Sequence, residues 1–382
     1  MSDIRRPRAP VQIPRAVDAP QTELAEASRL IRVFEARSHF NVRGDGLAAA
    51  VLDTGINSKH ADFTGRILAQ VNFTQDNGGA PNDATDGDGH GTNVAGIIAA
   101  DGDHVGVAPG AGLVPMKVLG NNGSGSFADI DRALQWVLEH HATHNITVVS
   151  MSLGTSSNEA SDTDLFDDPI RRSIKELTSK RIAVVVAAGN DYFRHGSRQG
   201  MGYPAIIRDC VSVGAVYDED VGSMEYSDGA TAFETGQDRL TPFSQRLHPS
   251  VNPDCYTRIF APGAPIRSSG LPTGPNNFNG ESVQDGTSQA TPVISGVLLL
   301  MQQLYLRKTG RMPDVADLVD WLRRSAATIF DGDDERDNVE NSNLSYRRVD
   351  AFAALELVSK RLDMQRMKAA LGMTLASTAR VR

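Results

Sequence analysis

The chain has 382 residues, of which 40% are hydrophobic and 22% are charged, and these values are typical of a soluble globular protein with a large core. Its formal net charge of -9 argues against general nucleic-acid binding, which normally uses a basic surface. The most apolar run, residues 293–306, contains two glutamines and is shorter than the roughly 20 residues of a transmembrane helix. We therefore expect neither a nucleic-acid partner nor a transmembrane segment.

Residues 1–24 are rich in proline and arginine, so we expect an extended, solvated N-terminal extension. This stretch has no apolar segment of the kind found in secretory signals, and the sequence therefore predicts a cytoplasmic protein. Cys210 and Cys255 are the only cysteines, which excludes a disulfide framework. Two buried thiols are expected, with a single bridge as the alternative. Nothing in the sequence indicates the oligomeric state.

A polar helix is expected at residues 22–36, and apolar segments then alternate with helical patterns. Strands are predicted at residues 47–53, 112–119, 146–152, 181–190, 210–216 and 256–263, and helices at residues 92–100, 127–141, 168–180, 293–306, 314–326 and 349–362. Short strands that are apolar throughout, with helices between them, indicate a parallel sheet that is buried on both faces. The predicted fold is a three-layer, doubly wound α/β fold with a mostly parallel sheet and helices on both faces.

One large domain is expected over residues 25–360. Within it, the acidic and turn-rich residues 217–238 interrupt the pattern and are interpreted as a surface loop insertion. Residues 361–382 form a basic tail. This tail is either a loosely held terminal helix or a helix that binds a partner or a membrane surface.

Four polar residues follow predicted strands or begin predicted helices, where an α/β sheet binds its ligands. Asp53 stands in VLDTG, His90 in DGHGT, Asn190 in VVVAAGN and Ser288 in DGTSQATP. Singly, these residues are common as turn formers, loop residues and helix caps. Together they provide a nucleophile, a base to activate it, a carboxylate to orient the base and an amide donor for an oxyanion.

Two other hydrolase classes fit the sequence poorly. The Asp-Thr-Gly at Asp53 also occurs in aspartic proteases, but these need a second such carboxylate, and no second copy is present. The Gly-x-Ser-x-Gly pattern of lipases and esterases is missing around Ser288. We therefore expect Asp53 to serve a histidine.

The segments DTGINSKHADF, HGTNVAGI, AAGN and GTSQATP appear in the order of the subtilisin-like serine proteases, which this chain resembles from about residue 25 to about residue 360. The resemblance implies a serine endopeptidase that hydrolyses peptide bonds through an acyl-enzyme intermediate. It assigns Asp53 as the orienting carboxylate, His90 as the base and then the acid, Ser288 as the nucleophile, and Asn190 to the oxyanion hole. The rival hypothesis is a catalytically inactive relative that acts as a binding scaffold.

The resemblance also implies polypeptide substrates that pair as an extended strand with the enzyme, and a pocket of small residues that favours a bulky apolar side chain. The residues that it assigns to substrate binding are Gly123, Ser124, Gly125, Ser152, Leu153, Gly154, Ala187, Ala188, Gly189 and Gly202. Three basic residues near the expected pocket rim, Arg194, His195 and Arg198, are either a solvated loop or a selector for acidic side chains.

No cofactor is expected for the chemistry. By the resemblance, Asp62 is a candidate calcium ligand, because it occupies a position where many members of the family ligate calcium. Two acidic groups offer further carboxylates, namely Asp83, Asp86 and Asp88, and Asp331, Asp333 and Asp337, although acidic loops are usually only solvated. The companion loop, residues 100–109, is short compared with the calcium-binding version. By the same resemblance, the N-terminal segment around residues 11–17 either lies in the active-site cleft and restrains activity, or is disordered.

Overall fold

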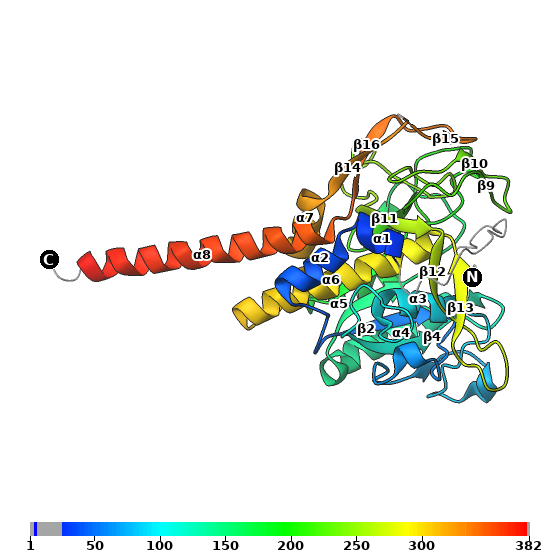
Figure 1. Ribbon diagram of the computed structural model, residues 1–382, viewed down its shortest axis with the longest axis horizontal. Helices are drawn as coiled ribbons and strands as arrows, with labels where there is room; N and C mark the ends of the chain where they lie inside the picture. The colour runs from blue at the N-terminus through cyan, green and yellow to red at the C-terminus, as the bar shows by residue number, and fades with distance from the viewer. Residues whose placement is uncertain (1–3, 6–24, 333, 380–382) are drawn as a thin grey trace.

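A nine-stranded sheet forms the centre of the protein in this computed structural model, which describes residues 4–5, 25–332 and 334–379 (Figure 1). The strand order is β14-β16-β11-β8-β7-β6-β2-β4-β3, and every neighbouring pair is parallel except β14 with β16. The strands are β2 Ala48–Asp53, β3 Val71–Asn72, β4 Gly112–Lys117, β6 Ile146–Met151, β7 Ala183–Ala187, β8 Val211–Tyr217, β11 Ile259–Ala264, β14 Ala327–Asp331 and β16 Leu344–Arg348. The mostly parallel sheet confirms the predicted fold class.

Helices cover both faces of this sheet. They are α1 Ala25–Leu30, α2 Val33–Phe40, α3 His90–Ala99, α4 Phe127–His144, α5 Pro169–Ser179, α6 Thr287–Thr309, α7 Val315–Ser325 and α8 Ala351–Ala379, with short 3-10 turns η1 Ala61–Phe63, η2 Asn77–Gly79 and η3 Thr163–Leu165. Successive side chains of a strand point to opposite faces. Ala49 and Val51 of β2 therefore join a core with α3 and α6, whereas Ala50 and Leu52 join a second core with α4 and α5. One core lies on each face of the sheet, so the sheet is the middle of three layers.

Smaller sheets lie at the edges of the three-layer body. Strands β12 Ile266–Gly270 and β13 Gly280–Gln284 form an antiparallel pair, and β9 Met224–Glu225, β10 Thr231–Glu234 and β15 Arg336–Asp337 form a three-stranded sheet. Near the N-terminus, β1 Ile4–Arg5 pairs antiparallel with β5 Ser124–Gly125. The rest of the expected N-terminal extension lies outside the described residues.

Three local expectations differ from the structure. The single helix predicted at residues 22–36 is two helices, because Arg32 between them has a left-handed φ of 55° that no continuous α-helix accommodates. The acidic stretch at residues 217–238 is partly a sheet, and its Met224 and Tyr226 are buried in the α6-side core. Strands β14 and β16 lie between the helices predicted at residues 314–326 and 349–362, where no strand was expected.

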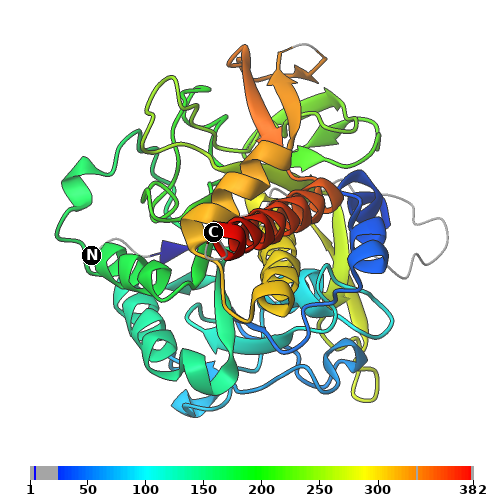
Figure 2. The same cartoon turned by 90° about the vertical axis from the view of Figure 1, so that its left-hand side faces the viewer.

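The C-terminal helix α8 projects from the body, as the two views in Figures 1 and 2 show. It runs from Ala351 to Ala379, so the boundary predicted at residue 361 falls inside one helix. Residues 380–382 of the expected tail lie outside the described part of the chain.

Cys210 and Cys255 are both buried and free, which confirms the preferred prediction for the cysteines. Among the described residues, no helix is sufficiently long and apolar to cross a membrane.

Candidate active site

Asp53 and His90 meet at the carboxyl end of the parallel sheet. Asp53 is the last residue of β2, and His90 is the first residue of α3. The Nδ1 atom of His90 lies 2.8 Å from Oδ1 of Asp53, and both side chains are buried. Because a carboxylate only accepts, Nδ1 carries a proton and donates to Asp53. Nε2 has no hydrogen-bond partner within the described part of the chain. His90 therefore has one ring nitrogen held by Asp53 and the other available to a ligand.

A second buried carboxylate, Asp86, fixes the start of α3. Its Oδ2 accepts from the backbone N–H and the hydroxyl of Thr92, and its Oδ1 accepts from the hydroxyl of Thr54, the residue after Asp53. Burial alone would raise the pKa of Asp86, but hydrogen bonds from the Gly89 backbone and from Thr92 outweigh it and lower that pKa. A Cβ on Gly91 would lie 2.3 Å from the Gly55 carbonyl oxygen, so only glycine lets α3 approach β2 this closely.

Ser288 and Asn190 lie together at the start of α6. Ser288 is the second residue of that helix, and its backbone N–H is among the first N–H groups, which have no partner inside the helix. The side-chain oxygen of Asn190 accepts from the backbone N–H (2.9 Å) and the hydroxyl (2.8 Å) of Thr287. These two bonds fix the orientation of the amide, whose buried Nδ2 has no partner among the described residues. A Cβ on Gly286 would lie 2.9 Å from that nitrogen.

The first turns of α3 and α6 pack against each other. Gln289, next to Ser288, donates to Asn93 Oδ1 at 3.3 Å, and Gln284 donates to the carbonyl of Gly89 at 3.5 Å. The Ser288 hydroxyl itself donates to the Ser152 carbonyl at 3.3 Å. The structure thus forms the Asp53–His90 hydrogen bond but not a bond from Ser288 to His90.

The residues expected to bind substrate fall into two groups. Ser124 and Gly125 form β5, next to Gly123, and the backbone edge of β5 is paired with Ile4–Arg5 of the same chain. Around the other group, Gly202 donates its N–H to the Ala188 carbonyl, and Thr155 donates to the Tyr203 carbonyl.

This second group is packed too closely for larger side chains. A Cβ on Gly154 would lie 3.0 Å from the Tyr203 carbonyl oxygen, and a Cβ on Gly202 would lie 2.8 Å from the Thr155 carbonyl oxygen. Ala187, Ala188, Ser152 and Leu153 are buried. Ser152 and Gly189 contact the start of α6, since Ser152 donates to the Ser288 carbonyl and the Gly189 N–H donates to the Thr287 hydroxyl.

The three basic residues near the expected rim contact their own loop or neighbouring segments. Arg194 is exposed and lies 3.5 Å from Asp191, Arg198 donates to the His195 carbonyl, and the ring of His195 lies 2.9 Å from the Ser156 carbonyl oxygen. These contacts agree with a solvated loop.

The surroundings of Asp62 do not suit a calcium ion, which needs six to eight oxygen ligands. Its Oδ2 lies 2.8 Å from Nδ1 of His104 and accepts from the Ser269 hydroxyl at 2.6 Å, and its Oδ1 accepts from the His104 backbone N–H. Burial alone would raise the pKa of Asp62, but these hydrogen bonds outweigh it and lower that pKa. Imidazole nitrogens take the places where calcium would need oxygens.

Three supporting residues escaped the sequence interpretation. Lys117 is fully buried at the end of β4, and its ammonium group donates to the Thr54 carbonyl at 2.6 Å, which holds the turn after Asp53. The sequence feature that could have identified Lys117 is its position inside the apolar segment 112–119, which was predicted to be a buried strand. Asp86 was grouped with solvated acidic residues, and His104 was unmarked because its partner Asp62 lies 42 positions away.

The chain is similar to known serine proteases. The Subtilase family matches residues 44–348. The intracellular serine protease of Paenibacillus polymyxa is 30% identical over 93% of this chain and 94% of its own length, and the major intracellular serine protease of Bacillus subtilis is 32% identical over 78% and 82%. The alkaline elastase YaB of a Bacillus species is 34% identical over 68% of this chain, which spans 55% of that protein. Members of the family need no cofactor for catalysis, and many bind structural calcium. The chain belongs to the subtilase family and is a subtilisin-like serine endopeptidase.

Proposed function

We propose that Asp53, His90 and Ser288 form the catalytic triad and that Asn190 provides the oxyanion hole together with the Ser288 backbone N–H. The observation that carries this proposal is the 2.8 Å contact between His90 Nδ1 and Asp53 Oδ1, which leaves Nε2 of a buried imidazole unpartnered in the described part of the chain. A buried base without a partner costs free energy, so such a group usually has a role.

In the proposed reaction, His90 Nε2 takes the proton of the Ser288 hydroxyl as Oγ attacks the scissile carbonyl carbon. The Ser288 hydroxyl now donates to the Ser152 carbonyl, and it leaves this acceptor by rotation about one side-chain torsion. The oxyanion accepts from Asn190 Nδ2, which the two Thr287 bonds orient. Asp53 stabilises the imidazolium, which then protonates the leaving amine. Water then attacks the acyl-enzyme through the same steps, with His90 again as the base and then the acid.

Substrates are proposed to add as a strand at the edge of β5 and beside residues 152–154. Pairing of Ile4–Arg5 with Ser124–Gly125 supports this proposal, because an extended segment of the same chain lies along this edge. The small residues 154, 188, 189 and 202 favour a bulky apolar side chain before the scissile bond. The names of the Paenibacillus polymyxa and Bacillus subtilis relatives include "intracellular", and we propose the same location for this chain.

Labelling with a serine-directed phosphonate tests the assignment. Wild type is expected to lose activity as one equivalent is bound, and Ser288→Ala is expected to bind none. Ser58→Ala is the matched control, since Ser58 is an exposed serine five positions after Asp53. An unlabelled wild type would instead support the inactive scaffold, and labelling retained in Ser288→Ala would move the nucleophile elsewhere.

Asn190→Ala is expected to lower kcat by about 10²–10³-fold with a smaller effect on KM. That magnitude has been measured for the corresponding donor of a subtilisin and is carried over to this chain. A normal kcat would exclude Asn190 from the oxyanion hole.

A further inference from the structure

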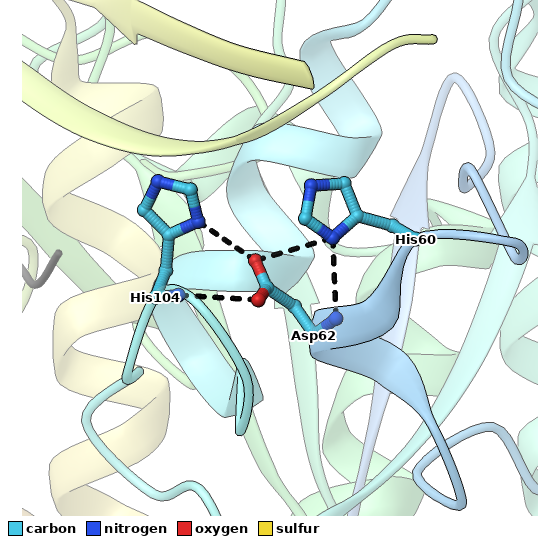
Figure 3. A group of neighbouring side chains, drawn as sticks. All are labelled: His60, Asp62 and His104. Atoms are coloured by element: carbon cyan, nitrogen blue, oxygen red, sulfur yellow. Dashed lines mark hydrogen bonds and ion pairs between the residues drawn. The ribbon is translucent and has the colours of Figure 1, made fainter. Parts of the chain in front are cut away.

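His60, Asp62 and His104 form a buried cluster that the proposed reaction does not use (Figure 3). His60 and Asp62 come from the turn η1 after β2, and His104 comes from the loop after α3. One ligand-type atom of each residue lies within 4.8 Å of the other two. The rings of both histidines turn Nδ1 toward the same carboxylate, as Figure 3 shows.

The protonation of His60 leaves an electron-rich nitrogen next to Asp62. Its Nε2 lies 3.0 Å from the Gly280 carbonyl oxygen, which can only accept, so Nε2 carries the proton. The lone pair of Nδ1 therefore stands 3.3 Å from Oδ2 of Asp62, with the Asp62 backbone N–H at 3.2 Å as its donor. This length is at the long end of the normal range for a hydrogen bond. Two electron-rich atoms held in this way attract a cation.

His104 completes the arrangement from the opposite side of the carboxylate. Its Nδ1 lies 2.8 Å from Asp62 Oδ2, and its Nε2 lies 3.2 Å from Oε1 of Glu281. A metal-binding histidine usually gives its other N–H to a backbone carbonyl or a carboxylate, which sets the tautomer and the ring orientation. His60 faces such a carbonyl and His104 such a carboxylate.

We propose that His60 Nδ1, His104 Nδ1 and Asp62 Oδ2 bind one divalent ion of the zinc class. The Ser269 hydroxyl, 2.6 Å from the same Oδ2, or a water molecule supplies the fourth ligand. Two nitrogens and a carboxylate suit zinc and disfavour calcium, which prefers oxygen. On binding, the metal–nitrogen bond replaces the N–H bond at Nδ1 of His104, and that proton leaves to solvent.

The two distances to Asp62 fit this chemistry with a small adjustment, and the two histidine nitrogens lie within 4.8 Å of each other. Tetrahedral bonds of 2.0–2.1 Å place neighbouring ligand atoms about 3.3 Å apart. The His60 Nδ1 to Asp62 Oδ2 distance is already 3.3 Å, and the 2.8 Å between His104 Nδ1 and Oδ2 needs to open by about 0.5 Å.

A bound ion would connect three segments that support the active site. The first segment is the turn after β2, and β2 ends at Asp53. The second is the loop after α3, and α3 begins at His90. The third is the β12–β13 pair, which supplies Ser269, Gly280 and Glu281. An ion that binds only the folded state raises its stability by mass action.

Metal binding is measured on full-length Ser288→Ala protein, which avoids autolysis, stripped with chelator and held at about pH 8, because metal binding releases a proton and is therefore favoured at higher pH. One equivalent of Zn²⁺ by elemental analysis, a Tm that rises by a few degrees with Zn²⁺ but not with Ca²⁺, and the visible absorption of tetrahedral Co²⁺ are expected. An absent Tm shift together with less than one tightly held Zn²⁺ overturns the proposal.

Variants locate the ion. His104→Gln is expected to weaken Zn²⁺ binding by about 100-fold or more, and Glu281→Gln, a change at a half-exposed side chain that spares the core, by about 10–100-fold. His140→Gln is the matched control, because it removes the His140/His144 pair, whose i, i+4 spacing on α4 suits adventitious metal. Retained affinity in His104→Gln, or loss of binding in His140→Gln, would place the ion elsewhere and refute the site.

Discussion

Arg246 is a buried cation whose only close carboxylate among the described residues, Asp331, is also buried, and this pair makes a strong prediction about stability. Nε of Arg246 lies 3.0 Å from Oδ2 of Asp331, and Nη2 lies 3.2 Å from Oδ1. The guanidinium also stacks 3.7 Å from the ring centre of Tyr192, two positions after Asn190. The pair therefore supports the loop that follows the proposed oxyanion donor.

Asp331→Asn is expected to destabilise the protein by about 3 kcal/mol. Removing one partner of a buried ion pair typically costs about 3–5 kcal/mol, because the other charge is left unpaired in a poorly polarisable interior. Arg246 retains weak bonds to the carbonyls of Thr241 and Ser244 at 3.4 and 3.3 Å, which favours the lower end of that range. The equilibrium constant for unfolding should therefore rise by roughly 10²-fold.

Urea unfolding in the Ser288→Ala background measures this loss without autolysis. Glu356→Gln, which breaks the exposed Lys360–Glu356 pair on α8, is the control and should change stability by less than about 0.5 kcal/mol. Combining Asp331→Asn with Arg246→Met removes the unpaired charge and should recover part of the loss. A loss below about 1 kcal/mol in Asp331→Asn, or a double variant less stable than the single one, would refute the reasoning.

Gly189→Ala should cost about 1–3 kcal/mol and lower kcat, because φ is +115° and the new Cβ would lie 1.9 Å from Gln245 Oε1; urea unfolding that matches wild type contradicts this. Burial alone would raise the pKa of Asp162, but hydrogen bonds from Arg208 outweigh it and lower that pKa to about 2. Since the folded pKa is depressed, Asp162 stabilises the fold above about pH 4, and this contribution is lost as the pH falls toward 2. Asp162→Asn should therefore lower the unfolding free energy at neutral pH by about 2 kcal/mol and flatten its acid limb, and an unchanged limb counts against the ion pair. Deleting residues 1–5 should raise kcat/KM for peptides several-fold, since β1 covers the edge of β5; equal values would show that it does not compete.

Local sequence patterns were sufficient to predict the elements whose burial is either uniform or regularly periodic along the chain. Strands such as β2 and β7 are apolar at every position because both faces of a parallel sheet are covered, and α4 and α5 carry the helical spacing of one buried face. Asp53 at the end of such a strand and His90 between two glycines at the start of a helix were predicted from the sequence, and the fold brings them to 2.8 Å.

Tertiary structure decided the features that depend on partners remote in sequence. Strands β14 and β16 are only five residues each and alternate buried and exposed positions, and their pairing with each other and with β11 makes them strands. His104 contacts Asp62, which lies 42 positions away in the sequence, and Arg246 contacts Asp331, which lies 85 positions away. From the sequence alone a charged side chain is predicted to be solvent-exposed, because its burial and its oppositely charged partner exist only once the chain has folded.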